Sequence, residues 1–404
     1  SRYPSSMAWW RTLADAGQKF LEQPENKLPG VQEEGALVSV FAPGRVNIIG
    51  EHTDYSEGFV FPMALEVGTV ITAQPVSGTR CRIYSDSLRE AVEFDISDSL
   101  SRSETSWHNY VIGPFALFRE QVTTAIPAFN AVIKSNLPIG GGVSSSASLL
   151  VCMATLLEHL TKHPMDPKLK ALLCQAAEHR WAMLPCGIMD QFCSVFGQQG
   201  HAVLIDCRAQ SVRAVPLNAA HVSLLVTNTH VHHELGSSEY PLRVAQCKEA
   251  VAAINATGNS ITFLRDANME MLEKARQSAS DVVYRRAKHV ITENERTLAA
   301  VDAFQRADYS VAGRLMYESH ASLKDDFEVS CEELDTIVAA TKGVPGVHGS
   351  RMTGGGFGGC TVTLVEKGQE ESVAAVLSQV FQDKFSKACT HMISRPGPGC
   401  GLCG

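Results

Sequence analysis

The stretch Pro138-Ile-Gly-Gly-Gly-Val-Ser-Ser-Ser-Ala-Ser148 stands between two segments of different character. Residues 131–135 predict a strand, whereas apolar residues recur at helical spacing through residues 146–160. Glycines allow backbone amides to approach a phosphate closely, and the start of a helix favours an anion. No lysine precedes the serines, so the pattern is not a Walker A loop. We therefore expect a phosphate-binding loop, the alternative being an ordinary glycine-rich turn with a serine helix cap.

A second glycine-rich stretch is Gly354-Gly-Gly-Phe-Gly-Gly359, which formally contains the pattern GxGxxG. A dinucleotide fingerprint requires a helix after the glycines, but residues 360–364 read as a strand. The stretch therefore predicts a loop of minimal bulk that presses against a ligand or against another loop. A simple hairpin loop is the alternative.

A third motif, Gly44-Arg-Val-Asn-Ile-Ile-Gly-Glu-His-Thr-Asp-Tyr55, gathers full charges between apolar residues. Glu51 and Asp54 could accept hydrogen bonds from vicinal hydroxyl groups, which suits a sugar. Arg45 carries a permanent charge and a rigid fork of donors, which suits a phosphate or a carboxylate. The alternative is a surface loop held by ion pairs.

Size and composition limit the class of protein. The chain has 404 residues, which favours two domains, and a formal net charge of -8 argues against general binding to nucleic acid or anionic membranes. Most of the 12 cysteines lie in apolar segments and read as buried free thiols. No stretch resembles a signal peptide or a membrane span, so we expect a cytoplasmic protein. Cys400 and Cys403 form a CxxC without a second pair of metal ligands.

Strands and helices interleave along the chain, which predicts a mixed α/β or α+β fold. A strand is expected at residues 37–41, followed by a turn at Ala42-Pro43-Gly44. Further helices are expected at residues 9–20, 168–179 and 284–305.

The three motifs together resemble the GHMP kinase superfamily and, within it, the galactokinase subfamily. Pro185-Cys-Gly-Ile-Met-Asp-Gln191 and Ser237-Ser-Glu-Tyr240 are also similar to that subfamily. The resemblance runs from about Val38 to Leu364. It implies a GHMP N-terminal mixed-sheet domain over residues 1–215, a ferredoxin-like C-terminal domain over residues 216–404, and an active site in the cleft between them.

The resemblance implies transfer of the γ-phosphoryl group of MgATP to the C1 hydroxyl of galactose, which gives galactose 1-phosphate. Asp190 would act as the base or orient the attacking hydroxyl, and Arg45 would keep Asp190 ionised. The implied galactose-binding residues are Arg45, Glu51, His52, Asp54, Gly187, Asp190 and Tyr240. The implied ATP-binding residues are Trp107, Tyr110, Gly140, Gly142, Ser144 and Ser145. The implied Mg²⁺ ligands are Ser146 and Glu178.

Several of these residues have ordinary alternatives. Asp190 could be a helix N-cap, Glu178 a solvated charge, and Tyr240, Trp107 or Tyr110 core aromatics. The implied partners are the small molecules galactose and ATP, and we expect a monomer that binds neither nucleic acid nor membrane.

Two other activities compete with a galactose kinase. In N-acetylgalactosamine kinases, Ile tends to replace Thr53, and Ala and Trp tend to stand where this chain has Gly355 and Phe357. Non-enzymatic galactose sensors lack the pair that is Ser146-Ala147 here, so catalysis is favoured. His232 stands where the subfamily tends to have Arg or Lys, which predicts lower or more pH-dependent activity.

Overall fold

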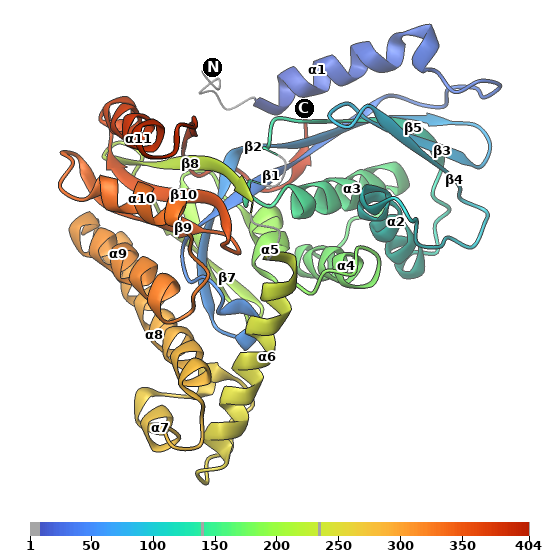
Figure 1. The fold of residues 1–404 in the computed structure, drawn as a ribbon. Helices are drawn as coiled ribbons and strands as arrows, with labels where there is room; N and C mark the ends of the chain where they lie inside the picture. The colour runs from blue at the N-terminus through green and yellow to red at the C-terminus, as the bar shows by residue number, and fades with distance from the viewer. Residues whose placement is uncertain (1–8, 139–140, 233–235, 404) are drawn as a thin grey trace.

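The computed structural model describes residues 9–138, 141–232 and 236–403, which build two bodies around two β-sheets (Figure 1). The first sheet runs in the order β12-β1-β2-β5-β3-β4. β6 pairs with the first residues of β2, Phe59 and Val60, and β7 pairs with β6. β3 pairs with β5 in parallel, and the other neighbours pair antiparallel. The strands of this mixed sheet are β1 (Val38–Ile49), β2 (Phe59–Val76), β3 (Arg80–Ser85), β4 (Glu90–Asp95), β5 (Ala128–Ser135), β6 (His201–Asp206), β7 (Ser211–Pro216) and β12 (Gly401–Leu402).

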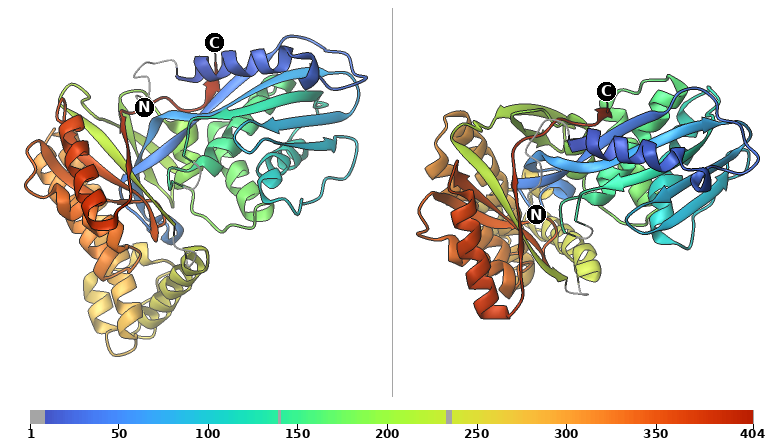
Figure 2. Two further views of the ribbon diagram at one scale, coloured as in Figure 1. Left: turned by 45° about the horizontal axis from the view of Figure 1, so that its top comes forward. Right: turned by 90° about the horizontal axis from the view of Figure 1, so that it is seen from above.

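Helices cover both faces of the first sheet (Figure 2). α1 packs on β2 and β5 from one side, and α3 packs on β1 and β2 from the other. α3 forms because its apolar residues fall on the face that meets the sheet, where Leu150, Met153 and Leu157 are buried. The helices of this body are α1 (Trp9–Glu22), α2 (Asn109–Gln121), α3 (Ser145–Thr161), α4 (Pro167–Arg180) and α5 (Met189–Phe196).

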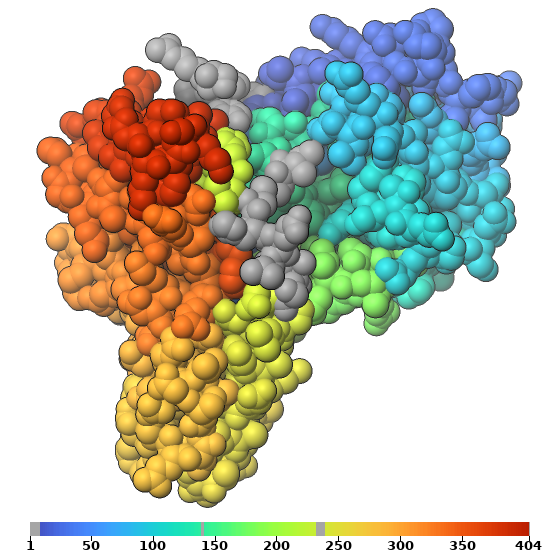
Figure 3. Space-filling view, viewed as in Figure 1, coloured from blue at the N-terminus to red at the C-terminus, as the bar shows by residue number. Residues whose placement is uncertain are grey.

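The second body is built on a four-stranded antiparallel sheet in the order β11-β8-β10-β9. Its strands are β8 (Val222–His232), β9 (Val347–Thr353), β10 (Gly358–Glu366) and β11 (Thr390–Ser394). Its helices are α6 (Gly236–Asn255), α7 (Met269–Lys274), α8 (Asp281–Gln305), α9 (Tyr309–Asp325), α10 (Glu332–Thr341) and α11 (Glu370–Phe385). The ends of α6 and α8 project with α7 as a separate lobe (Figure 3). The expected mixed α/β architecture is confirmed.

The C-terminal segment returns from the second body to the first. After β11, the amides of Gly397 and Cys400 donate to the carbonyls of Ala64 and Ser194 at 2.8 and 2.9 Å. β12 then pairs antiparallel with β1. Because Ser194 lies on α5, this strap holds α5 and β2 at the junction of the two bodies.

The turn expected at Ala42-Pro43-Gly44 is wrong, because β1 continues through these residues. A register shift between Pro43 and Arg45 accommodates the proline within the ladder. Gly44 is needed for close approach instead: a Cβ atom there would lie 2.7 Å from the carbonyl oxygen of Val143.

None of the helices in the described parts of the chain is both long and apolar enough to cross a membrane. The expected buried thiols are confirmed at Cys152, Cys174, Cys207 and Cys247.

Candidate active site

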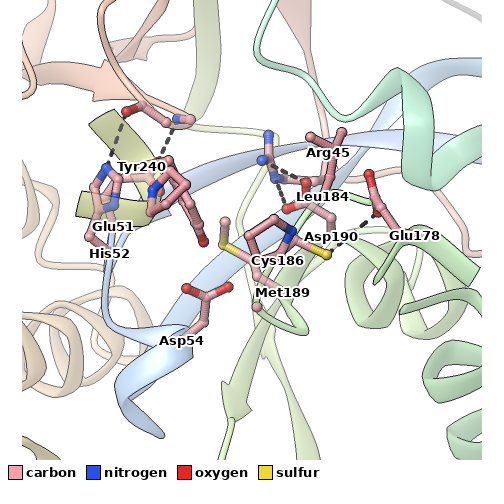
Figure 4. A pocket seen from close by; sticks show the side chains of 15 residues that line it. Arg45, Glu51, His52, Asp54, Glu178, Leu184, Cys186, Met189, Asp190 and Tyr240 are labelled. Carbon is pink, nitrogen blue, oxygen red and sulfur yellow. Dashed lines mark hydrogen bonds and ion pairs between the residues drawn. The ribbon is translucent and has the colours of Figure 1, made fainter. Parts of the chain in front are cut away.

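A pocket of about 370 Å³ lies where the two bodies meet (Figure 4). β1 and the loop after it, the loop before α5, the start of α6 and the loop between β9 and β10 all contribute to its wall. The pocket brings together eight of the residues predicted from sequence: Arg45, Glu51, His52, Asp54, Glu178, Gly187, Asp190 and Tyr240.

Arg45 and Asp190 form a two-pronged ion pair in this pocket. Arg45 Nε donates to Asp190 Oδ1 at 2.7 Å, and Nη2 donates to Oδ2 at 3.0 Å. Burial alone would lower the pKa of Arg45, but the charges of Asp190 and Glu51 raise it overall, so the guanidinium is a fixed cation. Asp190 lies inside the first turn of α5, whose N-cap is Ile188, so the N-cap alternative is wrong.

The glycine- and serine-rich loop reaches the same ion pair. Arg45 Nη1 donates to the carbonyl oxygen of Gly142 at 2.6 Å, and the Ser144 hydroxyl donates to Asp190 Oδ2. Ser144 has a left-handed backbone (φ 59°), and Ser145 begins α3. Gly140 lies outside the described residues. The loop that was predicted to hold phosphate is therefore joined directly to Arg45 and Asp190.

The second glycine-rich stretch is the hairpin loop between β9 and β10, and it presses against the first loop as predicted. A Cβ atom at Gly354 would lie 3.0 Å from the carbonyl oxygen of Gly142. Gly356 is more tightly confined, since its Cβ atom would lie 2.2 Å from the carbonyl oxygen of Val329. The absence of side chains lets the two loops meet.

Glu51 connects the loop after β1 to this hairpin. Its Oε1 accepts hydrogen bonds from the Gly354 amide at 2.8 Å and the Thr353 hydroxyl at 3.2 Å. Arg351, which is fully buried, lies 3.4 Å from the same oxygen. Arg351 and Thr353 directly precede the second glycine-rich stretch, but their contacts with Glu51 could not be predicted, because they lie about 300 residues from it along the chain.

Burial shifts the pKa values of both His52 and Asp54 toward their neutral forms. Burial lowers the pKa of His52 to about 3, so its ring is neutral, and it bonds the Tyr55 hydroxyl and the Gly355 carbonyl. Burial raises the pKa of Asp54 to about 7, and the charges of Asp190 and Glu51 act in the same direction. No ion pair neutralises Asp54 within the described residues.

Glu178, on α4, is buried rather than solvated. Its Oε2 accepts hydrogen bonds from Gln191 Nε2 at 2.6 Å and from the Cys186 thiol at 3.6 Å. Burial and the charge of Asp190 raise the pKa of Glu178 to about 7, whereas a hydrogen bond from Ser146 lowers it. Cys186 and Gln191 lie in the stretch that resembles the galactokinase subfamily, but sequence reasoning did not single them out.

Trp107 and Tyr110 lie outside the lining of this pocket. Both pack against the core of the first body, and Trp107 Nε1 donates to Glu90 at 3.0 Å. Tyr240, by contrast, faces the pocket, and its ring lies within 6 Å of the His52 and Tyr55 rings. The side chain of His232 lies outside the described residues.

Fold and site together define a small-molecule kinase of the GHMP type. The model for the GHMP kinases N terminal domain matches residues 109–198, and that for the GHMP kinases C terminal domain matches residues 300–383. The solved mevalonate kinase of Methanococcus jannaschii has the same fold, with a TM-score of 0.63 and 15% identity over 91% of this chain and 99% of that chain.

More specific matches point to one branch of that superfamily. The galactokinase galactose-binding signature matches residues 30–75. Galactokinases of Homo sapiens and Bos taurus are each 44% identical to this chain over 96% of its length and 95% of theirs. The crystal structure of Lactococcus lactis galactokinase complexed with galactose superimposes with a TM-score of 0.89, at 31% identity over 96% of this chain and 99% of that chain. The chain therefore belongs to the galactokinase family, and the expected two-domain GHMP fold is confirmed.

The contact between Gly187 and Asp54 offers a first test of the site. A Cβ atom at Gly187 would lie 1.7 Å from Asp54 Oδ2, so the Gly187→Ala variant must displace the carboxylate or the loop. We expect a loss of about 1–3 kcal/mol in the free energy of unfolding, measured by denaturant titration.

Gly355→Ala is the matched control, because it lies in the same pocket and its Cβ atom would meet nothing within 4 Å. Its stability should stay within about 0.5 kcal/mol of the parent protein. Equal stability of the two variants would contradict the close approach of Gly187 to Asp54.

Proposed function

We propose that this chain transfers the γ-phosphoryl group of MgATP to the C1 hydroxyl of α-D-galactose, giving galactose 1-phosphate and ADP. This is the first phosphorylation of galactose metabolism, the Leloir pathway. The observation that carries the proposal is the contact of Asp190 with both Arg45 and Ser144. It puts a carboxylate beside the sugar pocket and at the edge of the loop assigned to phosphate.

Asp190 orients the attacking hydroxyl and receives its proton as charge develops on the oxygen. An ordinary aspartate is a weak base for a sugar hydroxyl, so orientation supplies much of the effect. Arg45 holds the carboxylate by two hydrogen bonds, which limits its rotation. The same guanidinium offsets negative charge on the transferring phosphoryl group.

Galactose is recognised by the polar groups on the opposite wall. Asp54 accepts hydrogen bonds from sugar hydroxyls, and Glu51 offers its second oxygen while the first holds the hairpin loop. His52, Gly187 and Tyr240 complete the wall, with His52 acting as a neutral group. Such a set of acceptors suits a hydroxyl-rich ligand better than an anion.

ATP is held by the loop containing Gly140, Gly142, Ser144 and Ser145, and its base lies toward Trp107 and Tyr110. Glu178 and Ser146 fit a Mg²⁺ ion, because hard oxygen ligands suit it. The Glu178 carboxylate is buried, and no cationic side chain pairs with it in the described parts of the chain. When bound, Mg²⁺ would neutralise charge on the phosphates.

We also propose that the enzyme is a cytoplasmic monomer. The net charge of -8 and the buried free thiols support a soluble protein in a reducing compartment.

ADP release tests the activity. With MgATP and a panel of galactose, N-acetylgalactosamine, glucose and mevalonate, ADP should form only with galactose. ADP formation with N-acetylgalactosamine alone would indicate the related amino-sugar kinase. Galactose binding without ADP formation would indicate a sensor and refute the proposal.

Asp190→Asn tests the assigned base, because asparagine keeps the shape and one acceptor for Arg45 but removes the charge. We expect kcat to fall by a factor of about 10²–10⁴. Asp302→Asn, at an exposed position on α8, is the matched control and should keep the kcat of the parent protein. Near-parental turnover by a folded Asp190→Asn variant would show that Asp190 is not the catalytic base.

The raised pKa of Asp54 predicts a pH dependence of galactose binding. Ionised Asp54 accepts hydrogen bonds from the sugar, so below its pKa of about 7 the carboxyl must lose a proton when galactose binds. The dissociation constant should therefore rise by up to about tenfold per pH unit as the pH falls below about 7. Calorimetry without nucleotide, in buffers of different ionisation enthalpy, measures both the affinity and the released proton.

The Asp54→Asn variant should bind galactose more weakly but with a flatter pH profile, because the titrating group is gone. If the parent protein binds galactose equally well on both sides of pH 7, Asp54 does not bind the sugar as a carboxylate.

A further inference from the structure

Gln191 follows Asp190 on α5, and the activity proposed above gives it no role. Its side chain is completely buried. Its Nε2 donates to Glu178 Oε2 at 2.6 Å and lies 3.6 Å from the Cys186 sulfur. Its Oε1 has no hydrogen-bond partner among the described residues. An unpaired buried carbonyl is costly, so the fixed orientation of the amide needs a compensating contact.

The compensating contact is the one to Glu178. Gln191 and the Cys186 thiol both donate to the same oxygen, Oε2. Reversing the amide would place its carbonyl oxygen against the carboxylate, which is repulsive when Glu178 is ionised, so only the observed orientation suits the form that binds a cation. Two donors on a single oxygen fix the rotation of the Glu178 carboxylate, and neither of these donors contacts Oε1.

We propose that Gln191, assisted by Cys186, is the positioning residue that sets the affinity of the Glu178 site for its divalent cation. This inference rests on the proposed function, which assigns Mg²⁺ to Glu178 and Ser146. Hydrogen-bond partners behind a metal ligand orient it and commonly change metal affinity by about 10–100-fold.

A neutral donor suits this position better than a charged one. Lysine or arginine at residue 191 would neutralise Glu178 and compete with the cation. The glutamine amide orients the carboxylate and leaves its charge for the metal. Cys186 acts in the same way, because its thiol is a weak neutral donor.

The position of Gln191 also links the group beside the sugar with the site assigned to the cation. Asp190 and Gln191 are consecutive residues of one helical turn, and their side chains reach Arg45 and Glu178 respectively. A shift of α5 would therefore move both the carboxylate beside the sugar and the carboxylate assigned to the cation.

Gln191→Met tests the proposal, because methionine is similar in size and cannot donate. Mn²⁺ serves as the probe, and its binding in the presence of ADP is measured by electron paramagnetic resonance. We expect its affinity to fall by about tenfold. Galactose affinity, measured by calorimetry without metal or nucleotide, should equal that of the parent protein.

The controls separate a positioning role from a structural one. Cys186→Ala removes only the weak thiol donor to Oε2 and should lower the Mn²⁺ affinity by less than Gln191→Met does. Unchanged Mn²⁺ affinity in a folded Gln191→Met variant overturns the proposal, as does an equal loss of Mn²⁺ and galactose affinity. If thermal denaturation shows that Gln191→Met does not fold, Cys186→Ala is measured by the same criteria.

Glu178→Gln distinguishes the failure of this inference from failure of the metal assignment. If Glu178→Gln weakens Mn²⁺ binding and Gln191→Met does not, only the role of Gln191 is wrong. If neither variant changes Mn²⁺ binding, the cation does not bind at Glu178, and both the metal assignment and the role of Gln191 are wrong.

Discussion

The Arg45 guanidinium holds together three segments that are far apart in sequence. From β1 it binds Asp190 on α5 and the Gly142 carbonyl in the loop before α3. A buried ion pair adds little net stability, because the desolvation of both charges offsets their attraction. Removing one partner is different, since it leaves an uncompensated charge and typically costs about 3–5 kcal/mol. The pair therefore acts mainly as a geometric constraint, and it determines where the carboxylate lies relative to the phosphate loop.

Glycines form a second constraint, because the site requires backbones to approach one another. Gly44 lets β1 pass under the loop at Val143, and Gly187 makes room for the Asp54 carboxylate. At the junction of the two loops, Gly354 meets Gly142 directly. Steric exclusion of the Cβ atom explains these glycines better than the flexibility usually inferred for glycine-rich stretches. These close approaches bring the hairpin loop of the second body against the Gly142 loop, which itself contacts the Arg45–Asp190 ion pair.

Local pattern predicts local structure well in this chain. The helices expected at residues 146–160 and 168–179 differ from α3 and α4 by one residue at each end. α9 was not predicted, since Gly313 lowers its helical propensity; a Cβ atom there would lie 2.0 Å from the His348 carbonyl oxygen of β9. Contacts between distant segments, such as that of Glu51 with Gly354, leave no local pattern. The motifs indicated which residues would form the site, but only the fold shows which of them touch.

The charge of the pocket connects the geometry with its ligands. Among the described residues, its lining contains four carboxylates, Glu51, Asp54, Glu178 and Asp190, and a single permanent cation, Arg45. Burial and mutual repulsion raise the pKa values of Asp54 and Glu178 to about 7, so both readily hold protons in the absence of ligands. Hydroxyl groups of a sugar would favour the ionised form of Asp54, and a divalent cation would do the same at Glu178. Binding of each ligand should therefore release a proton, and the two events are coupled because both carboxylates lie near the charge of Asp190.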